Sequence, residues 1–380
     1  MKIIFLFNLS LLGLERIMSV YYEVNIKNLK VFLNENIDNI NKICYGQYHA
    51  IIVCNDGVYS CGNNDDGSVG IDNIEATQHP VKLNFFDGKI IRKISCGYNH
   101  TVAVCDDGVY AWGMNNRGQL GKGDTKLTLS PFKLEFFNSK IIRKISCGYV
   151  HTIAVCNDGV FVWGINDEGQ LGIPNMEFSF FPSKSQPTRL KFFDDKVVSK
   201  ISCGWYHNIV VCNDGVYVWG RNDSGQLGKG DIRPSSTPFK LDFFDNKIIF
   251  NIACGGNHTI AVCDDGVYVW GHNYFRQLGK GDTENALSPV RLDFFDGKDV
   301  HKISCGGWHS IAICSDGIYA WGWNKYDALN LEHNRQVSSP EKITGIDFDV
   351  ENAYCGFHNT FLKKAKPIVK AAIAPVMWRV

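Results

Sequence analysis

Histidine and cysteine recur in this chain at spacings that could hold a metal ion. Cys96, His100 and Cys105 stand close together in the sequence, and thiolate and imidazole are usual ligands of zinc. A zinc site needs three or four ligands that converge on one point, whereas this set returns along most of the chain. Tyr45 and Lys363 replace one cysteine in the first and last copies. We therefore predict no metal and no cofactor, and interpret the histidines as structural hydrogen-bonding residues: His49, His100, His151, His207, His258, His309 and His358.

The set recurs because one unit of sequence is repeated. The segment ISCGYNHTVAVCDDGVYAWG begins at Ile94, a weaker copy begins at Ile43, and a truncated copy follows Ala353. A fixed period of about fifty residues is typical of units that stack in a line or close into a ring. Most residues that resemble site residues are therefore parts of the unit. The other close copies begin at Ile145, Ile201, Ile252 and Ile303.

Each unit reads as a set of short β-strands. Segments 100–105 and 108–113 are rich in β-branched and aromatic residues and are joined by Asp-Asp-Gly, which indicates a hairpin. A loop rich in Gly and Asn, a proline-led segment (130–137) and a strand-like run (140–145) follow. Four short strands with no helical period describe one blade of a β-propeller. The tryptophans expected to wedge between blades are Trp112, Trp163, Trp219, Trp270 and Trp321.

The two ends of the chain suggest how such a ring would close. The sequence holds six complete hairpins and, at 353–363, a lone first strand of a seventh. The segment VYYEVNIKNLK (20–30) resembles VYVWGRNDSGQL in its aromatic alternation, so it could pair with that strand and remove exposed sheet edges. We therefore predict an all-β fold: a seven-bladed β-propeller of four-stranded blades, closed by pairing of the N- and C-terminal strands.

The repeat also carries a family resemblance. The pattern CGxxHTxAVxxDGxVYxWGxNxxGQLG is similar to the repeat of the regulator of chromosome condensation (RCC-type) family, over residues 20 to about 363. The resemblance implies a seven-bladed propeller closed by its two termini. The first copy departs from it at Cys61-Gly62 and at 68–70, and the sixth at 328–330, so we expect those two blades to be looser.

The chain divides into three parts. Residues 18–363 form the expected propeller, and 364–380 form a short tail. Residues 1–17 are apolar after Lys2, so they resemble a signal peptide; alternatively the protein starts at Met18, or the segment packs on the fold.

The amino-acid composition limits the classes of binding partner and the cellular compartment that we expect. Lys plus Arg equals Asp plus Glu, at 39 each, so no net field favours nucleic acid or an anionic membrane. The unpaired cysteines of the first and last copies argue against obligatory disulfides and favour a reducing compartment. We expect an intracellular monomer, cytoplasmic or nuclear, with secretion as the alternative if 1–17 is a signal peptide.

In a symmetric scaffold, function should lie where the symmetry is broken. The connector between His151 and His207 is five residues longer than usual and carries three phenylalanines. The two positions before each histidine vary and are often aromatic, as are the loops after Trp-Gly. Burial within or between blades is the alternative interpretation for these aromatic residues. The candidate partner-binding residues are Tyr48, Tyr98, Tyr149, Trp205, Tyr206, Trp308, Phe178, Phe180, Phe181, Tyr274, Phe275 and Arg276.

These features favour a binding protein over an enzyme. No Ser/His/Asp or Cys/His set stands apart from the repeat, so we predict no catalytic residues. A rigid scaffold with divergent loops commonly carries recognition, and we predict a scaffold that binds a protein partner through one propeller face. Two alternatives come with the resemblance: nucleotide exchange on a Ran-like small GTPase, and substrate targeting with a separate ubiquitin ligase.

Overall fold

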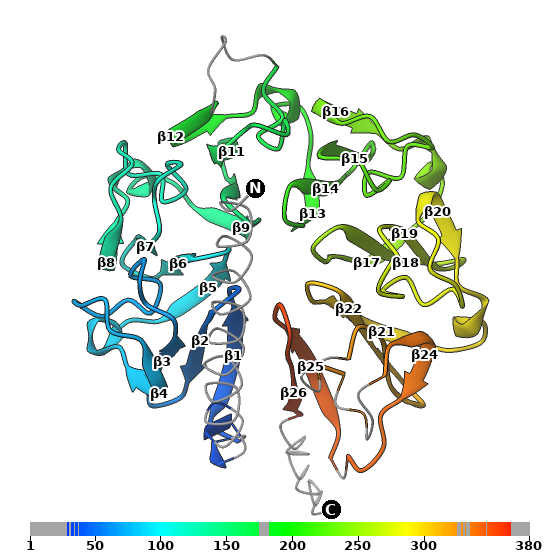
Figure 1. Ribbon diagram of the computed structural model, residues 1–380. Helices are drawn as coiled ribbons and strands as arrows, with labels where there is room; N and C mark the ends of the chain where they lie inside the picture. Colours follow the sequence, from blue (N-terminus) through cyan, green and yellow to red (C-terminus); the bar gives the residue numbers. More distant parts are fainter. Residues whose placement is uncertain are drawn as a thin grey trace, which may run out of the picture.

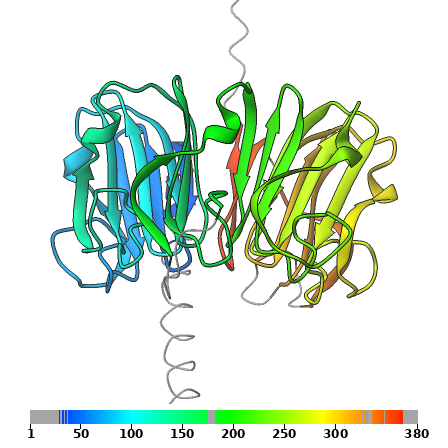
Figure 2. The ribbon, with the colours of Figure 1, turned by 90° about the horizontal axis from the view of Figure 1, so that it is seen from above.

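The chain forms a ring of β-sheets around a central axis in the computed structural model (Figure 1). The structure describes residues 29, 32–33, 35–36, 38–174, 182–324, 328–329, 331, 335–346 and 348–365. Within these residues, six antiparallel sheets have four strands each, and a further sheet has two. Turned by 90°, the molecule is a flat disc whose strands run from one face to the other (Figure 2).

Each blade uses consecutive strands. Blade one contains β1 (Ile40–Tyr45), β2 (His49–Cys54), β3 (Gly57–Gly62) and β4 (Thr77–Lys82). Blade two contains β5 (Ile91–Cys96), β6 (His100–Cys105), β7 (Val109–Gly113) and β8 (Thr128–Lys133). Blade three contains β9 (Ile142–Cys147), β10 (His151–Cys156), β11 (Gly159–Ile165) and β12 (Ser183–Arg189). Blade four contains β13 (Val198–Cys203), β14 (His207–Cys212), β15 (Gly215–Gly220) and β16 (Ser235–Lys240).

The remaining strands complete the ring. Blade five contains β17 (Ile249–Cys254), β18 (His258–Cys263), β19 (Gly266–Gly271) and β20 (Ala286–Arg291). Blade six contains β21 (Val300–Cys305), β22 (His309–Cys314), β23 (Gly317–Gly322) and β24 (Val337–Lys342). The two-stranded sheet contains β25 (Val350–Cys355) and β26 (Thr360–Lys364). Five 3-10 turns lead from one blade to the next: η1 (Asn84–Phe86), η2 (Glu135–Phe137), η3 (Lys191–Phe193), η4 (Asp242–Phe244) and η5 (Asp293–Phe295).

The hairpin prediction is confirmed. In blade two, Val102 pairs with Ala111 and Thr101 with Trp112 across β6 and β7. Both strands are buried along their whole length, because each blade packs against a neighbour on either side. The hydrophobic core therefore lies between blades: Ala111 of one blade and Trp163 of the next belong to the same cluster.

The prediction of seven four-stranded blades closed by strand pairing is wrong. The described residues form six four-stranded blades, and β25 and β26 stand alone as a two-stranded sheet. Within the described residues, no further strand pairs with β26 to complete this hairpin. Most of the segment expected to supply it (20–30) lies outside the described residues, and Leu29 and Leu33 are helical. These two leucines pack with Phe361 of β26 in the core of blade one, so the chain ends meet through side chains.

A repeated polar contact joins each blade to the next. The ring nitrogen Nε2 of His49 lies 2.9 Å from Thr101 Oγ1, and that of His151 lies 2.7 Å from Asn208 Oδ1. In both pairs the partner residue comes directly after the repeat histidine of the next blade in the sequence. The same contact is made by the pairs His100–Thr152, His207–Thr259, His258–Ser310 and His309–Thr360.

The tryptophans add a second bond at the same interfaces. Trp163 Nε1 donates a hydrogen bond to the carbonyl of Gln119, in the Gly-Gln-Leu-Gly loop of the preceding blade, at 2.9 Å. The indole is fully buried. The structure places the five tryptophans predicted to wedge between blades in this way: Trp112, Trp163, Trp219, Trp270 and Trp321.

The tryptophan contact predicts a large loss of stability on truncation. Trp163→Ala should lower the free energy of unfolding by about 3–5 kcal/mol, because a fully buried ring is removed. Trp163→Phe keeps most of the packing but loses one hydrogen bond. The loss of that bond should lower the free energy of unfolding by about 1 kcal/mol. Urea unfolding measures both. Phe132→Ala, at a side chain 44% exposed, is the control, and a similar loss there would contradict the assignment.

Buried histidines also make the fold sensitive to acid. Burial lowers the pKa of His151 and His309 to about 4 and that of His207 to about 3. An unfolded histidine takes up a proton near pH 6.5, whereas the buried ring stays neutral. Protons therefore favour the unfolded state, and the free energy of unfolding should fall as the pH drops from about 6.5 to about 4.

A single substitution can isolate this effect. His207→Asn should reduce the pH slope of the unfolding free energy by up to about 1.4 kcal/mol per pH unit, the slope for one proton. Asparagine suits the position, because Asn359 occupies it in the last repeat: its carbonyl accepts the bond from Gly356 N that a histidine carbonyl accepts in the other repeats. Urea unfolding at several pH values between 4 and 7 gives the slope. The exposed His301→Asn is the control, and an unchanged slope in His207→Asn would refute the prediction.

Candidate partner-binding face

The loops between Cys-Gly and the repeat histidine meet at the axis on one face of the ring. Backbone hydrogen bonds pass from one loop to the next: Gln47 N donates to Tyr98 O at 3.0 Å, and Tyr98 N donates to Tyr149 O at 2.9 Å. The loops are therefore held in a fixed order around the axis. The series continues at 2.9–3.2 Å through Tyr149–Trp205, Trp205–Gly256, Gly256–Gly307 and Gly307–Gly356.

Glycine allows these loops to approach so closely. A Cβ atom on Gly97 would overlap the ring of His100 and the carbonyl of Gly148 in the next loop. Gly97 N also donates to the carbonyl of His100 at 2.8 Å. The Cys-Gly-x-x-His spacing thus turns the chain sharply, and the two residues before each histidine are presented at the axis.

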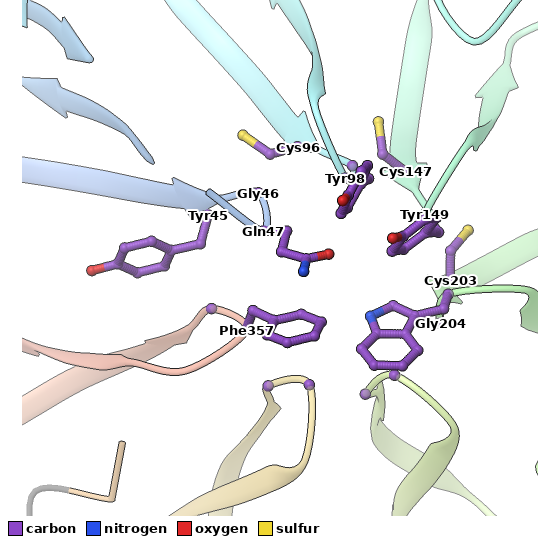
Figure 3. Close-up of a pocket in the computed structure, with 18 of the residues that line it drawn as sticks. Tyr45, Gly46, Gln47, Cys96, Tyr98, Cys147, Tyr149, Cys203, Gly204 and Phe357 are labelled. Carbon is purple, nitrogen blue, oxygen red and sulfur yellow. The ribbon is translucent and has the colours of Figure 1, made fainter. Parts of the chain in front are cut away.

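Tyrosines gather on one side of the axis. The rings of Tyr98 and Tyr149 stack with centroids 4.1 Å apart, Tyr48 meets Tyr98 at 5.8 Å, and Tyr206 meets Tyr149 at 5.3 Å. Figure 3 shows Gln47, Tyr98, Tyr149 and Phe357 turned toward the middle. Burial, followed by contact with Tyr98, raises the pKa of Tyr149. The Tyr149 phenol therefore stays neutral, and the stacked rings offer aromatic surfaces.

Larger rings fill the other side. Trp205 stacks on Phe357 at 5.1 Å with an interplanar angle of 13°, although they belong to blade four and the last repeat. Trp308 contacts both, at 5.3 and 4.6 Å, and lies 5.2 Å from Phe275. Gly256 leaves the space that the Trp205 ring occupies. We call the following residues the axial aromatic cluster: Tyr48, Tyr98, Tyr149, Trp205, Tyr206, Tyr274, Phe275, Trp308, Trp323 and Phe357.

A shallow cavity of about 190 Å³ lies beneath the cluster and is lined by the Cys-Gly loops of all seven repeats. The cysteines labelled in Figure 3 turn their sulfur atoms away from its centre. Cys147 Sγ donates to the carbonyl of Ser95 at 3.4 Å, and burial raises its thiol pKa to about 12. Such a thiol is not a nucleophile at neutral pH. The cavity therefore offers aromatic contact, and the Cys147 thiol supplies no nucleophile.

Charged residues border the tyrosine side of the cluster. Arg221 lies over the Tyr206 ring at 5.8 Å and pairs with Asp223. Burial is the main cause of a raised pKa at Glu168; the charges of Asp167 and Asp223 add to it, while Arg221 opposes it. An aromatic centre with a charged, partly solvated edge is the usual layout of a protein-binding surface.

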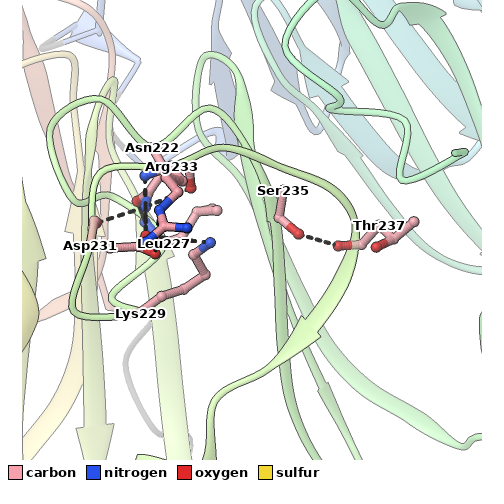
Figure 4. A network of polar contacts seen from close by, with 7 residues as sticks. All are labelled: Asn222, Leu227, Lys229, Asp231, Arg233, Ser235 and Thr237. Atoms are coloured by element: carbon pink, nitrogen blue, oxygen red, sulfur yellow. Dashed lines mark hydrogen bonds and ion pairs between the residues drawn. The ribbon is translucent and has the colours of Figure 1, made fainter. Parts of the chain in front are cut away.

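The loops after Trp-Gly lie on the same face and are fixed by buried asparagines. In blade four the Asn222 amide donates to the carbonyls of Asp231 and Arg233 at 2.8 and 2.9 Å, and its oxygen accepts from Leu227 N at 2.9 Å (Figure 4). Lys229 pairs with Asp231 at 3.4 Å. The loops are therefore parts of the rigid scaffold, and their exposed side chains are presented at fixed positions.

Most of the predicted partner-binding residues come together. Tyr274 is 67% exposed, and the other members of the cluster are half-buried. Phe178, Phe180 and Phe181 lie outside the described residues. The sequence analysis missed Phe357 and Trp323. Phe357 stands in the same column of the repeat as Tyr98, Tyr149 and Trp205, whereas the column of Trp323 holds no predicted residue. The residues brought into the cluster are Tyr48, Tyr98, Tyr149, Trp205, Tyr206, Trp308, Tyr274 and Phe275.

The last repeat has a different register from the one assumed. Asn359 occupies the position of the repeat histidine, because its carbonyl accepts the bond from Gly356 N that a histidine carbonyl accepts elsewhere. His358 therefore stands one place earlier and lies beside Trp308 and Trp323, at 5.4 and 4.7 Å. His358 is a neighbour of the axial aromatic cluster, and the histidine column assigned to it belongs to Asn359.

Arg276 has a strained backbone. Its φ is +64°, in the left-handed region, where the equivalent loops have Gly118, Gly169 and Gly225 at φ of 74–78°. A side chain at such a φ costs about 1–2 kcal/mol relative to glycine's freedom. The arginine lies next to Phe275 of the cluster, so the strain sits at the edge of the candidate face.

The described residues contain no group of three or more His, Cys, Asp or Glu side chains placed to hold a metal ion. In the same part of the chain, no helix has the length and apolar character needed to cross a bilayer. Fold and site together define a repeat-built β-propeller with one aromatic face.

The chain belongs to the family described as the RCC1-like domain, whose model matches residues 11–362. This confirms the resemblance seen in the repeat. The chain is 34% identical over 327 residues to the ultraviolet-B receptor UVR8 of Arabidopsis thaliana, covering 84% of this chain and 73% of that protein. It is 33% identical over 335 residues to the probable E3 ubiquitin-protein ligase HERC6 of Homo sapiens, covering 83% of this chain but only 32% of HERC6.

Solved structures show the same fold. Human WBSCR16 superposes with a TM-score of 0.74 at 22% identity, covering 86% of this chain and 87% of that one. Yeast RCC1 (Prp20), solved bound to Kap60, superposes with a TM-score of 0.74 at 23% identity, covering 88% and 82%. These two likenesses are evidence for the architecture alone.

The strain at Arg276 predicts that a smaller residue stabilises the fold. Arg276→Gly should raise the free energy of unfolding by about 0.5–1 kcal/mol. This is the backbone strain that is relieved, minus the cost of the greater conformational entropy that glycine gives the unfolded chain. Urea unfolding measures the change. Gly118→Ala at the equivalent position should do the opposite, since its Cβ would also press on the backbone of Ser185. Destabilisation by Arg276→Gly would show that the arginine serves packing.

Proposed function

We propose that the protein is a non-enzymatic scaffold that binds a protein partner through the axial aromatic cluster. One observation carries the proposal: rings from several different repeats, including Trp205, Trp308, Phe275 and Phe357, contact one another at the axis. Aromatic side chains at the centre of a surface are the usual anchors of protein interfaces. The charged edge around Arg221 and Glu168 would supply orientation and solubility.

A comparison within the chain supports a role beyond packing. The aromatic residues that stabilise the blades recur with the tryptophans of blades two to six, as Phe137 beneath Trp163 does. The cluster residues do not recur, since Gly256 and Gly307 replace a ring in two loops. The blades therefore fold without aromatic residues at this position. Their accumulation on one face is better explained by recognition.

The setting we propose is intracellular, cytoplasmic or nuclear, with the propeller acting as a monomer. All fourteen cysteines are free, which supports a reducing compartment. The matched part of HERC6 is about a third of that protein, which supports the use of this propeller as a binding module. Nucleotide exchange on a Ran-like GTPase and targeting for a separate ubiquitin ligase are outcomes that the test below can detect.

The test places a photo-crosslinking amino acid at Tyr274, the exposed member of the cluster, and in a second protein at Phe239 on outer strand β16. Partners captured only from Tyr274 are identified and purified. Trp205→Ala with Trp308→Ala should weaken their binding by roughly thirtyfold or more, the effect of losing at least one anchor worth about 2 kcal/mol. Phe132→Ala with Phe239→Ala is the matched control.

Two results would contradict the proposal. Equal loss of binding in the control pair would show that the cluster is not the contact surface. Faster release of fluorescent nucleotide from Ran at sub-stoichiometric amounts of this protein would establish exchange instead. Circular dichroism of the tryptophan variants separates lost binding from lost folding.

A further inference from the structure

The opposite end of the axis is a basic cavity. It has a volume of about 440 Å³ and lies among the inner strands β1, β5, β9, β13 and β17. Its lining includes Lys42, Lys93, Arg143, Lys144 and Lys200. Each of the four lysines stands three residues before the cysteine or tyrosine that ends its strand, so they face the axis on the side away from the aromatic cluster. The volume is that of a small-molecule site.

These cations differ from a second series of lysines in the repeat, each of which is paired with an aspartate. Within the described residues, no carboxylate lies within ion-pair distance of Lys93, Arg143, Lys144 or Lys200, whereas a lysine before each inner strand of blades two to six pairs with an aspartate. The neutralised pairs are Lys89–Asp107, Lys140–Asp158, Lys196–Asp214, Lys247–Asp265 and Lys298–Asp316.

The axial cations repel one another. Burial lowers the pKa of Lys144, and the charges of Lys200 and Lys93 lower it further. Lys42 Nζ donates to the carbonyl of Ile94 at 3.3 Å, which gives it a neutral partner only. Half-buried like charges in one cavity raise the free energy of the empty site. An anion that enters the cavity would remove this repulsion.

We propose that the basic axial cavity binds a small polyphosphate anion. Several ammonium groups arranged around one space match a ligand that carries several negative charges close together. The Arg143 guanidinium can hold two oxygens of one phosphate group, since its donors form a planar fork. The amide of Asn251 lines the same cavity and can donate to a further oxygen.

Titration calorimetry with tripolyphosphate tests the site. Lys144→Gln with Lys200→Gln should weaken binding by roughly tenfold or more, because two charge-assisted contacts are lost. Lys126→Gln with Lys191→Gln changes the net charge equally at exposed positions away from the axis, and should leave the affinity unchanged. Absence of binding to the wild-type protein, or equal weakening in both variants, would overturn the proposal.

Thermal unfolding provides a second readout that does not depend on calorimetry. Tripolyphosphate should raise the Tm of the wild-type protein, because it binds the folded state. The axial double variant should fold and lose this rise. Vesicles that contain phosphatidylinositol bisphosphate show whether the phosphate ligand is a free anion or a lipid headgroup. Absence of vesicle binding supports a free anion. Vesicle binding that tripolyphosphate blocks supports a lipid headgroup bound in the same cavity. Vesicle binding that survives in the axial variant would count against the cavity.

Discussion

The fold depends on one crowded contact between neighbouring blades. A histidine ring of one blade bonds a hydroxyl or amide at the start of the next, and the indole of that next blade bonds back to the first blade's glutamine carbonyl. Both bonds are buried, so loss of either partner leaves a polar group away from water. The Cys-Gly turn, the small residues on the second strand and the tryptophan all follow from this contact. Repeating it around the axis leaves little freedom in blade geometry.

This constraint separates scaffold from function. Residues that make the inter-blade contact must recur, and only positions free of it can vary. Those positions collect at the two ends of the axis: aromatic rings from different repeats on one face, and unneutralised cations on the other. The two ends differ in chemistry because the loops and the strand starts lie at opposite ends of the same inner strands. One ring can therefore present two unrelated surfaces.

Much of this was readable from the repeat, and the failures have physical causes. The Asp-Gly turn between β6 and β7 predicted the hairpin, and the columns before each histidine predicted the aromatic residues at the axis. The prediction of a seventh four-stranded blade depended on aromatic alternation in 20–30; the one described residue of that segment, Leu29, is helical, and Leu29 and Leu33 have the spacing of a helix face. The register predicted for the last repeat was wrong by one residue, because His358 was assigned to the histidine column. The spacing of Asn359 from the preceding histidines fits that column better. The basic axial cavity could not be predicted from the sequence, because only the structure shows that its lysines gather at the axis with no carboxylate of the described residues within ion-pair distance.

The junction between β1 and the two-stranded sheet lacks the polar contact found elsewhere in the ring. Ala50 stands where other blades offer a hydroxyl or amide, and Asn359 stands where they offer an imidazole. The Tyr354 hydroxyl donates to the carbonyl of Asn41 at 3.3 Å, Lys364 pairs with the exposed Asp38 at 3.1 Å, and apolar packing adds to these contacts. This junction is therefore the hinge of the ring: transient opening should start there, and the amides of β1 and β25 should exchange with solvent deuterium before those of the inner strands on the far side.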